Sequence, residues 1–177
     1  SVTIPSYADN FLKQAIAQAK TLAGDDILTE GAKIYTTLDT TAQQKLYNIV
    51  NTGNYINYPD DTMQVASTVT DVKTGAVIAQ IGGRNQPSNV TFGFNQAVQT
   101  DRDWGSTMKP IVDYGPAFEN NIYTSTNNYV SDSPTTYPNG TPLKNWDNTY
   151  FGSMTVKSAL ALSRNIPAVK TLINVGL

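Results

Sequence analysis

The chemistry of this chain is predicted from two polar residues three positions apart, Ser106 and Lys109. If a helix begins here, these positions share one face, so the serine hydroxyl and the lysine amine can meet within one turn. Pro110 favours a helix that begins no earlier than Ser106, because proline lacks an N–H and clashes with the carbonyl four residues before it. Ser106 would then lie at the positive end of the helix dipole, beside a candidate base.

The chain contains no histidine and no cysteine among its 177 residues. A Ser-His-Asp triad, a Cys-His dyad, the common zinc sites and all disulfides are therefore excluded within it. A nucleophilic serine must instead use lysine, tyrosine or a carboxylate as its base. A lysine can do so only when its pKa is lowered, and a helix N-terminus beside Lys109 favours this. We expect neither a metal nor a cofactor.

The charge balance excludes some classes of partner. A net charge of −2 and a pI near 4.9, without a lysine or arginine cluster, argue against nucleic acid or an anionic membrane. No apolar run approaches the roughly 20 residues of a membrane span, and the first residues lack the regions of a signal peptide. Any membrane anchor is therefore expected in a missing N-terminal segment.

Apolar spacing predicts the elements before Ser106. Helices are predicted over 7–23 and 40–50, the second capped by Asp39 or Thr40. A short strand is predicted at 32–38. Two further strands, at 63–72 and 76–81, are joined by Lys73-Thr74-Gly75 and predict an antiparallel hairpin. Two strands are marginal alone, so this hairpin is expected to belong to a larger sheet.

The elements after Ser106 are predicted to position a second group of polar residues, Ser163-Arg164-Asn165. The helix at Ser106 is expected to end at Ala117 or Glu119, and the polar stretch 120–153 is predicted to be functional or poorly ordered. One short helix begins at Thr155 and another ends at Gly176. The tight junction between them carries Ser163-Arg164-Asn165, and Arg164 is expected at the surface or in support of its neighbours.

The order of S-x-x-K, in Ser106-Thr107-Met108-Lys109, and then S-x-N, in Ser163-Arg164-Asn165, resembles penicillin-binding proteins and serine β-lactamases. The phrases at 33–39, 80–83, 94–97 and 152–165 are similar to bifunctional, class A penicillin-binding proteins, the 1a type of Gram-positive cocci. The resemblance implies an α/β (α+β) transpeptidase fold, with an antiparallel sheet flanked by helices, only partly contained in this chain.

The resemblance also implies roles for the matching residues. Ser106 would be the nucleophile, acylated by the penultimate D-alanine of a peptidoglycan stem peptide or by a β-lactam antibiotic. Lys109 would take its proton, Ser163 would relay a proton toward the leaving group, and Asn165 would bind the amide of the acyl donor. Trp104 and Tyr150 are candidates for the wall of a peptide groove, with local packing as the alternative.

One family motif departs from the pattern. The K-T-G or K-S-G strand is absent after Ser106, and Lys73-Thr74-Gly75 lies upstream in a hairpin turn. We therefore expect residues 1–60 to be an interdomain connector and 61–177 the N-terminal part of a transpeptidase domain. A separate chain is expected to carry the remainder with its K-[ST]-G motif. The parent protein is expected to be membrane-anchored on the extracytoplasmic face and to be a glycosyltransferase as well.

The leading hypothesis is a D,D-transpeptidase that cross-links stem peptides and is a target of β-lactams. A D,D-carboxypeptidase or a β-lactamase is an alternative with the same fold and the same Ser-Lys pair, although no recognisable deacylating carboxylate neighbours the S-x-x-K motif. A non-catalytic penicillin-sensing or wall-binding module is a third possibility. Such a module would be acylated without passing the acyl group to an amine.

Overall fold

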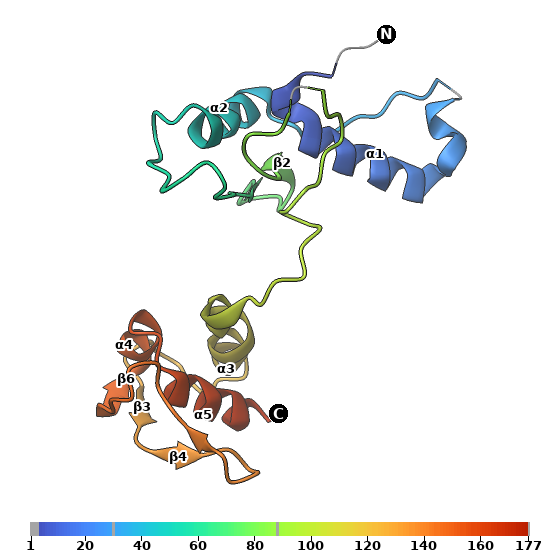
Figure 1. The fold of residues 1–177 in the computed structure, drawn as a ribbon. Helices are drawn as coiled ribbons and strands as arrows, with labels where there is room; N and C mark the ends of the chain where they lie inside the picture. The colour runs from blue at the N-terminus through green and yellow to red at the C-terminus, as the bar shows by residue number, and fades with distance from the viewer. Residues whose placement is uncertain (1–3, 30, 88, 177) are drawn as a thin grey trace. The chain divides into compact units, whose positions relative to one another are not determined.

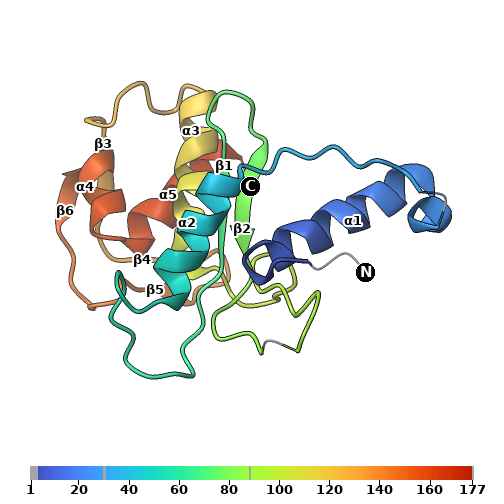
Figure 2. The ribbon, with the colours of Figure 1, turned by 90° about the horizontal axis from the view of Figure 1, so that it is seen from above.

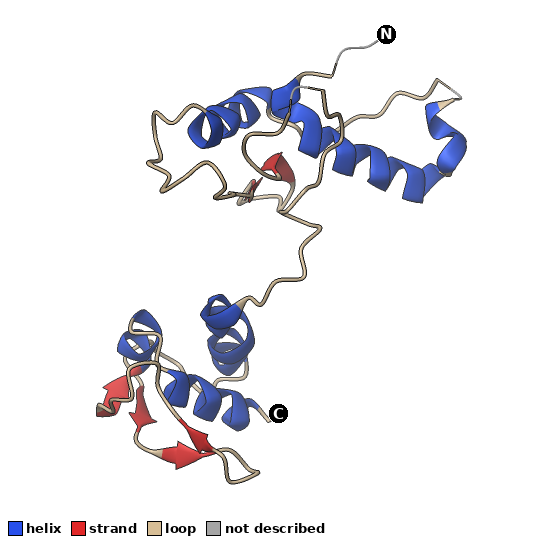
Figure 3. Cartoon of the chain, viewed as in Figure 1, coloured by secondary structure: helices blue, strands red, loops and turns tan. Residues whose placement is uncertain are grey.

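A computed structural model describes residues 4–29, 31–87 and 89–176. The chain forms two compact units, Ser1–Asp101 and Arg102–Leu177, each of which combines helices with short strands (Figures 1 and 3). The strand pairs in the described residues are all antiparallel. No helix within these residues is long and apolar enough to cross a membrane.

Two helices frame the first unit. Helix α1 (Asp9–Ala23) follows a 3₁₀ turn at Ser6–Ala8, and α2 is Thr40–Asn51. Asp39 caps α2, because its carboxylate accepts the N–H of Ala42 at 2.9 Å. Both predicted helices are confirmed, and the cap is Asp39 rather than Thr40.

The predicted hairpin is confirmed with shorter strands, β1 (Ser67–Thr70) and β2 (Val77–Ile81). Its turn forms because the Asp71 carboxylate accepts the N–H groups of Lys73 and Thr74, at 3.0 and 2.8 Å. Gly75 then adopts a φ of +73°, which glycine reaches without steric cost. The predicted turn at Lys73-Thr74-Gly75 is thus confirmed, and Asp71, which was predicted in the first strand, belongs to the turn as well.

The strand predicted at 32–38 is wrong. This segment has no strand, although Asp39 N–H donates to the carbonyl oxygen of Ile78 at 2.9 Å. The Thr37 hydroxyl donates to the carbonyl of Val77 at 2.6 Å. The Thr37 hydroxyl thus bonds to the Val77 carbonyl, which in a β-ladder would accept a backbone N–H. The β-branched composition of this segment alone did not produce a strand.

A buried glutamine holds α2 against β2. The Gln43 side chain is fully buried, accepts the N–H of Gln80 at 2.8 Å and donates to the Gln80 carbonyl at 3.0 Å. Gln43 thus pairs with β2 as a neighbouring strand would, which satisfies backbone groups that would otherwise be costly to bury. The apolar core beside it includes Phe11, Ala79 and Ile81.

The second unit begins with one helical run of three geometries. A 3₁₀ turn at Gly105–Met108 leads into a π-helix at Lys109–Tyr114 and then into α3 (Gly115–Glu119). The π-helical bond joins the Gly115 N–H to the carbonyl of Pro110. A Cβ at Gly115 would lie 2.8 Å from that oxygen, so glycine permits the wider turn.

The helix predicted at Ser106 is thus confirmed in extent, with differences at its start. It begins one residue earlier, at Gly105, and its first ten residues are not α-helical. Pro110 explains part of this, because it cannot donate to the carbonyl four residues before it and crowds that carbonyl. Single π turns of this kind often occur at functional sites.

The polar stretch 120–153 contains strands that the sequence did not predict. They are β3 (Tyr129–Asp132), β4 (Thr135–Thr136) and β5 (Pro142–Leu143), and β6 (Gly152–Thr155) follows. β3 pairs with β6, and β4 pairs with β5. The stretch is therefore folded rather than a plain connection.

Two predicted helices complete the second unit, α4 (Val156–Ala161) and α5 (Asn165–Val175). Thr155 caps α4, and Gly176 ends α5 with a left-handed φ of +107°. The core joins residues of the helical run, the β3–β6 pair and both helices. Figure 2 shows these elements from a second direction. Its buried members are Tyr114, Ala117, Tyr123, Val130, Met154, Val156, Ala159 and Ala168.

Candidate active site

The amine of Lys109 is the centre of the candidate site. Its Nζ lies 3.1 Å from Ser106 Oγ and 3.1 Å from Ser163 Oγ. It also lies 2.8 Å from the backbone oxygen of Ser163 and 2.7 Å from Asn165 Oδ1. The four residues predicted from the two motifs are thus brought together around the Lys109 amine, although Ser163 and Asn165 lie 54 and 56 positions after Lys109, at the junction of α4 and α5.

The four oxygens around Lys109 match the needs of a neutral amine. The Ser163 carbonyl and the Asn165 amide oxygen can only accept, so they take the two N–H groups that a neutral amine retains. The hydroxyls of Ser106 and Ser163 can each donate, so either can supply a proton to the lone pair. The Lys109 amine can therefore accept a proton from one serine hydroxyl and donate it to the other.

The surroundings of Lys109 favour that neutral form. Its side chain is 8% exposed, and burial lowers the pKa of the amine because the charged form loses its hydration. The carboxyl group of Asp113 opposes this by raising the same pKa. Burial in turn raises the pKa of Asp113, which lies in the same helical run.

Ser163 adopts a backbone conformation that is unusual for serine. Its φ is +52°, in the left-handed region, at the junction between α4 and α5. The turn is closed by the Ser163 N–H, which donates to Leu160, and by the Arg164 N–H, which donates to Ala159. A residue held in this region outside glycine typically costs about 1–2 kcal/mol, so the surrounding contacts must maintain it.

Ser106, Lys109 and Asn165 line one cavity of about 480 Å³, which Asp113, Tyr137 and Lys144 also line. This volume lies within the range of small-molecule binding sites. Ser106 itself is exposed, so its hydroxyl can meet a substrate, whereas Lys109 is buried behind it. A reactive oxygen at the surface with its base beneath is suited to attack on a carbonyl carbon.

The two aromatic candidates lie outside that lining. Trp104 precedes the 3₁₀ turn and is 63% exposed, and Tyr150 precedes β6 and is 41% exposed. Neither belongs to the residues that line the cavity. Their contact with a substrate therefore remains a prediction.

A buried polar network that was not predicted from the sequence lies next to the serine-lysine group, around Arg164. Arg164 is not at the surface, because it is 1% exposed and its Nε donates to Asp132 at 2.9 Å. A second ion pair joins Arg164 Nη1 to Asp147 Oδ2 at 2.8 Å. The N–H of Thr149, its hydroxyl and Arg164 together lower the pKa of Asp147 to about 2. The spacing from Asp132 to Arg164 follows no periodic pattern, so no sequence signal identified the network.

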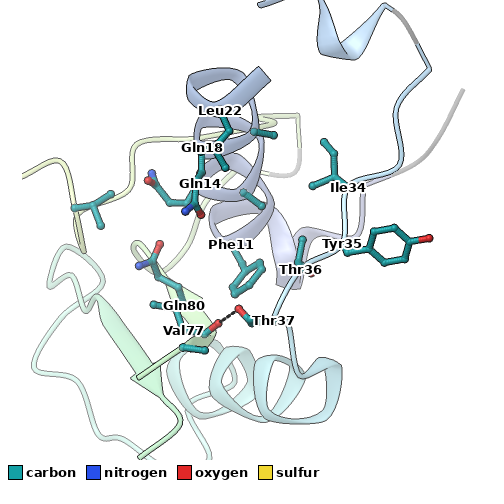
Figure 4. Close-up of a pocket in the computed structure, with 14 residues that line it drawn as sticks. Phe11, Gln14, Gln18, Leu22, Ile34, Tyr35, Thr36, Thr37, Val77 and Gln80 are labelled. Carbon is teal, nitrogen blue, oxygen red and sulfur yellow. Dashed lines mark hydrogen bonds between the residues drawn. The ribbon is translucent and has the colours of Figure 1, made fainter. Parts of the chain in front are cut away.

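A separate cavity of about 570 Å³ occurs in the first unit, between α1 and the segment 34–37 (Figure 4). Phe11 and Leu22 contribute apolar surface to it, and the Thr37 hydroxyl is bonded to Val77 beside it. None of the residues predicted to be catalytic lines this cavity. No serine or lysine lines this cavity, so it lacks the groups of the candidate active site despite its size.

Among the residues that the structure describes, no three acidic side chains are grouped to hold a metal ion. The chemical groups that are assembled are hydroxyls, one amine and one amide.

Comparison with protein families matches residues 65–177 to the penicillin-binding protein transpeptidase domain. The chain is 56% identical over 174 residues to penicillin-binding protein 1A of Streptococcus oralis. The aligned region covers 98% of this chain and 27% of that protein. It is 55% identical to penicillin-binding protein 1A of Streptococcus pneumoniae over 98% of this chain and 24% of that protein. The chain thus spans about a quarter of the length of these relatives.

A comparison of folds finds the penicillin-binding protein PonA1 from Mycobacterium tuberculosis. The TM-score is 0.72 at 25% sequence identity, and the match covers 93% of this chain and 40% of that chain. A structure of PonA1 in complex with penicillin V matches with a TM-score of 0.71 at 25% identity, over 94% of this chain and 42% of that chain.

Proposed function

The chain belongs to the family of penicillin-binding protein transpeptidase domains, and we propose that it supplies the nucleophile, base and proton relay of a D,D-transpeptidase. The observation that carries this proposal is the position of Lys109 Nζ, 3.1 Å from both Ser106 Oγ and Ser163 Oγ. A stem peptide ending in D-Ala-D-Ala is the proposed acyl donor, and β-lactams are the proposed inhibitors.

The first half-reaction forms an ester on Ser106. Neutral Lys109 accepts the hydroxyl proton while Oγ attacks the carbonyl carbon of the penultimate D-alanine, and a tetrahedral oxyanion forms. When that intermediate collapses, the bond to the terminal D-alanine nitrogen breaks. The proton on Lys109 passes through the Ser163 hydroxyl to this nitrogen, so the base is neutral again and D-alanine leaves.

The second half-reaction transfers the acyl group to an amine. The amine of a second stem peptide attacks the ester carbonyl, its proton is taken up through the same relay, and Ser106 Oγ leaves with that proton. Attack by water instead of the amine would give hydrolysis, as in a carboxypeptidase or a β-lactamase. The identity of the acceptor therefore separates these functions, since the first step is common to them.

The proposed substrate contacts follow from unused hydrogen-bonding capacity. Asn165 Oδ1 accepts from Lys109, and its Nδ2 donates to the Lys144 carbonyl at 3.1 Å. One lone pair and one N–H remain for the amide of the donor peptide. The backbone N–H of Ser106 is the proposed oxyanion donor, since donors preorganised there stabilise the developing charge. Trp104 and Tyr150 are proposed to contact the peptide at the rim.

A further part of the domain is proposed to complete the site. Residues 61–177 are proposed to form its N-terminal part, and a strand with K-[ST]-G is proposed to supply the second oxyanion donor and a cation for the substrate carboxylate. This is supported by the streptococcal relatives, of which the chain covers 24% to 27%. The natural protein is proposed to be anchored in the cell membrane, with this site on the outer face, and to carry a glycosyltransferase module.

The reaction can be tested in the natural protein with a pentapeptide donor and an excess of a stem-peptide amine. We expect cross-linked dimer and free D-alanine, and neither product from a Ser106→Ala variant. Free tetrapeptide without dimer would identify a carboxypeptidase, and rapid hydrolysis of penicillin would identify a β-lactamase. Acylation without turnover on any acceptor would identify a sensor and contradict the proposal.

A further inference from the structure

The start of α5 is capped by a side chain from a distant part of the chain. Asn145 Oδ1 accepts the N–H of Asn165 at 2.9 Å and the N–H of Ile166 at 3.2 Å. These are first-turn N–H groups, which have no partner inside a helix. The residue at the N-cap position, Arg164, makes no side-chain cap bond. Asn145 therefore performs the capping that the local sequence does not supply.

Asp132 in turn fixes Asn145. Asn145 Nδ2 donates to Asp132 Oδ1 at 2.6 Å and to the Thr149 carbonyl at 2.9 Å. Asp132 is fully buried on β3, and its Oδ2 accepts the Nε–H of Arg164 at 2.9 Å and the N–H of Phe151 at 3.1 Å. One carboxylate thus holds both the residue that caps α5 and the arginine that precedes α5.

The segment 144–149 encloses the turn 163–165 with further contacts. The Lys144 carbonyl accepts from Asn165 Nδ2, and Trp146 Nε1 donates to the Leu162 carbonyl at 3.2 Å. Asp147 pairs with the guanidinium of Arg164, which also donates to the Thr149 carbonyl. This segment therefore holds Leu162, Arg164 and Asn165, on both sides of Ser163. The Ser163 hydroxyl, the Ser163 carbonyl and Asn165 Oδ1 contact Lys109.

We propose that Asn145 and Asp132 are positioning residues for the acyl transfer, which hold Ser163 and Asn165 against Lys109 through the backbone of α5 and the side chain of Arg164. The inference rests on the proposed function. Ser163 has a φ of +52°, which requires support from its surroundings. If the turn relaxes, Lys109 loses Ser163 O, Ser163 Oγ and Asn165 Oδ1 together, because all three belong to the same short segment.

A reciprocal exchange of amide and carboxylate tests this inference in the natural protein. Asn145→Asp places two carboxylates against each other. Asp132→Asn gives residue 132 an amide N–H that must face a donor in either orientation, either the Asn145 amide or the N–H groups of Arg164 and Phe151. The double variant restores a complementary pair: the amide at 132 donates to the carboxylate at 145, whose other oxygen still accepts from α5. The bond from 145 to the Thr149 carbonyl is lost, although Arg164 still donates to that oxygen. The ion pair between Arg164 and residue 132 becomes a hydrogen bond to a neutral amide oxygen, while the new carboxylate at 145 keeps one negative charge in the network.

The measured quantity is the second-order rate constant for acylation by penicillin. It is divided by the fraction of folded protein, which an unfolding curve gives at the assay temperature. We expect each single variant to lose about 10-fold to 10²-fold, as for displaced catalytic groups, and the double variant to regain most of the parental rate. Asn148→Asp is the matched control, because it adds the same charge in the same segment, at an exposed side chain. Its rate is expected to equal that of the parent.

Two results would overturn the inference: folded single variants that acylate at the parental rate, or a folded double variant as slow as the singles. If the parent itself is not acylated, the proposed function fails instead. Hydrogen exchange of the unmodified protein covers the case in which variants do not fold. We expect slow exchange at the amides of Asn165 and Ile166, and exchange at the rate of unprotected amides would contradict the contact with Asn145.

Discussion

Lys109 contacts Ser163 at two atoms, since its amine lies 2.8 Å from the backbone oxygen and 3.1 Å from the hydroxyl. The backbone contact holds the amine against the turn, and the hydroxyl contact provides a route for a proton. Ser163 makes both contacts from a backbone with a positive φ, at the junction of α4 and α5. One residue thus meets the base with both its backbone and its side chain.

Replacement of Lys109 by arginine should remove the base while keeping the positive charge. An arginine cannot lose its proton at working pH, so penicillin acylation is expected to fall by at least about 10². Stopped-flow or gel-based labelling measures this rate. Lys144→Arg is the control, because Lys144 lines the same cavity without a bond from its amine to Ser106. A Lys109→Arg protein within a few-fold of the parent would show that the lysine acts only by charge or structure.

The pH dependence of acylation should change when the charge of Asp113, which neighbours Lys109, is removed. Acylation requires the neutral amine, so its rate rises with pH through the pKa of Lys109, which burial lowers and Asp113 raises. Asp113→Asn removes the opposing charge and should lower that pKa further. The acidic limb of the rate profile is therefore expected at lower pH in this variant. Glu119→Gln, at the exposed end of α3, is the control for lost charge. A limb that does not move, or moves to higher pH, would contradict the assigned base.

Glycine and alanine at position 163 should lower acylation alike but should differ in their effect on stability. Both variants lack the relay hydroxyl, so both are expected to lose about 10² or more in acylation rate. Glycine accepts a positive φ, whereas alanine there costs about 1–2 kcal/mol. Chemical denaturation should therefore find the Ser163→Gly protein more stable than Ser163→Ala by about 1 kcal/mol. At Ser158, inside α4, the order should be reversed. A Ser163→Ala protein that is more stable than Ser163→Gly, as expected at Ser158, would mean that the left-handed turn is absent in solution.

The sequence allowed prediction of the reactive group because its signals are local. Ser106 and Lys109 share a turn, Ser163 and Asn165 flank a helix start, and Thr155 and Gly176 mark helix ends. Each of these features depends on backbone chemistry within a few residues. Placing the two segments together came from the family resemblance, and the distances around Lys109 agree with it.

The buried network was not predicted because its members are neighbours only in the folded chain. Asp132, Asn145 and Arg164 lie on a strand, in a connecting segment and before a helix, so their spacing has no period. The π-helix was missed for a related reason, since it depends on both Pro110 and the space that Gly115 leaves. The false strand at 32–38 shows the reverse error, in which composition suggested pairing that the backbone does not make.

The identity of the acylated residue tests the central claim most directly. The natural protein is treated with penicillin and digested, and the modified peptide is sequenced by mass spectrometry. We predict one penicilloyl adduct on Ser106, because its exposed hydroxyl lies 3.1 Å from the buried amine of Lys109. An adduct on Ser163, Ser125 or any other serine, with Ser106 unmodified, would contradict the assignment of the nucleophile and the mechanism built on it.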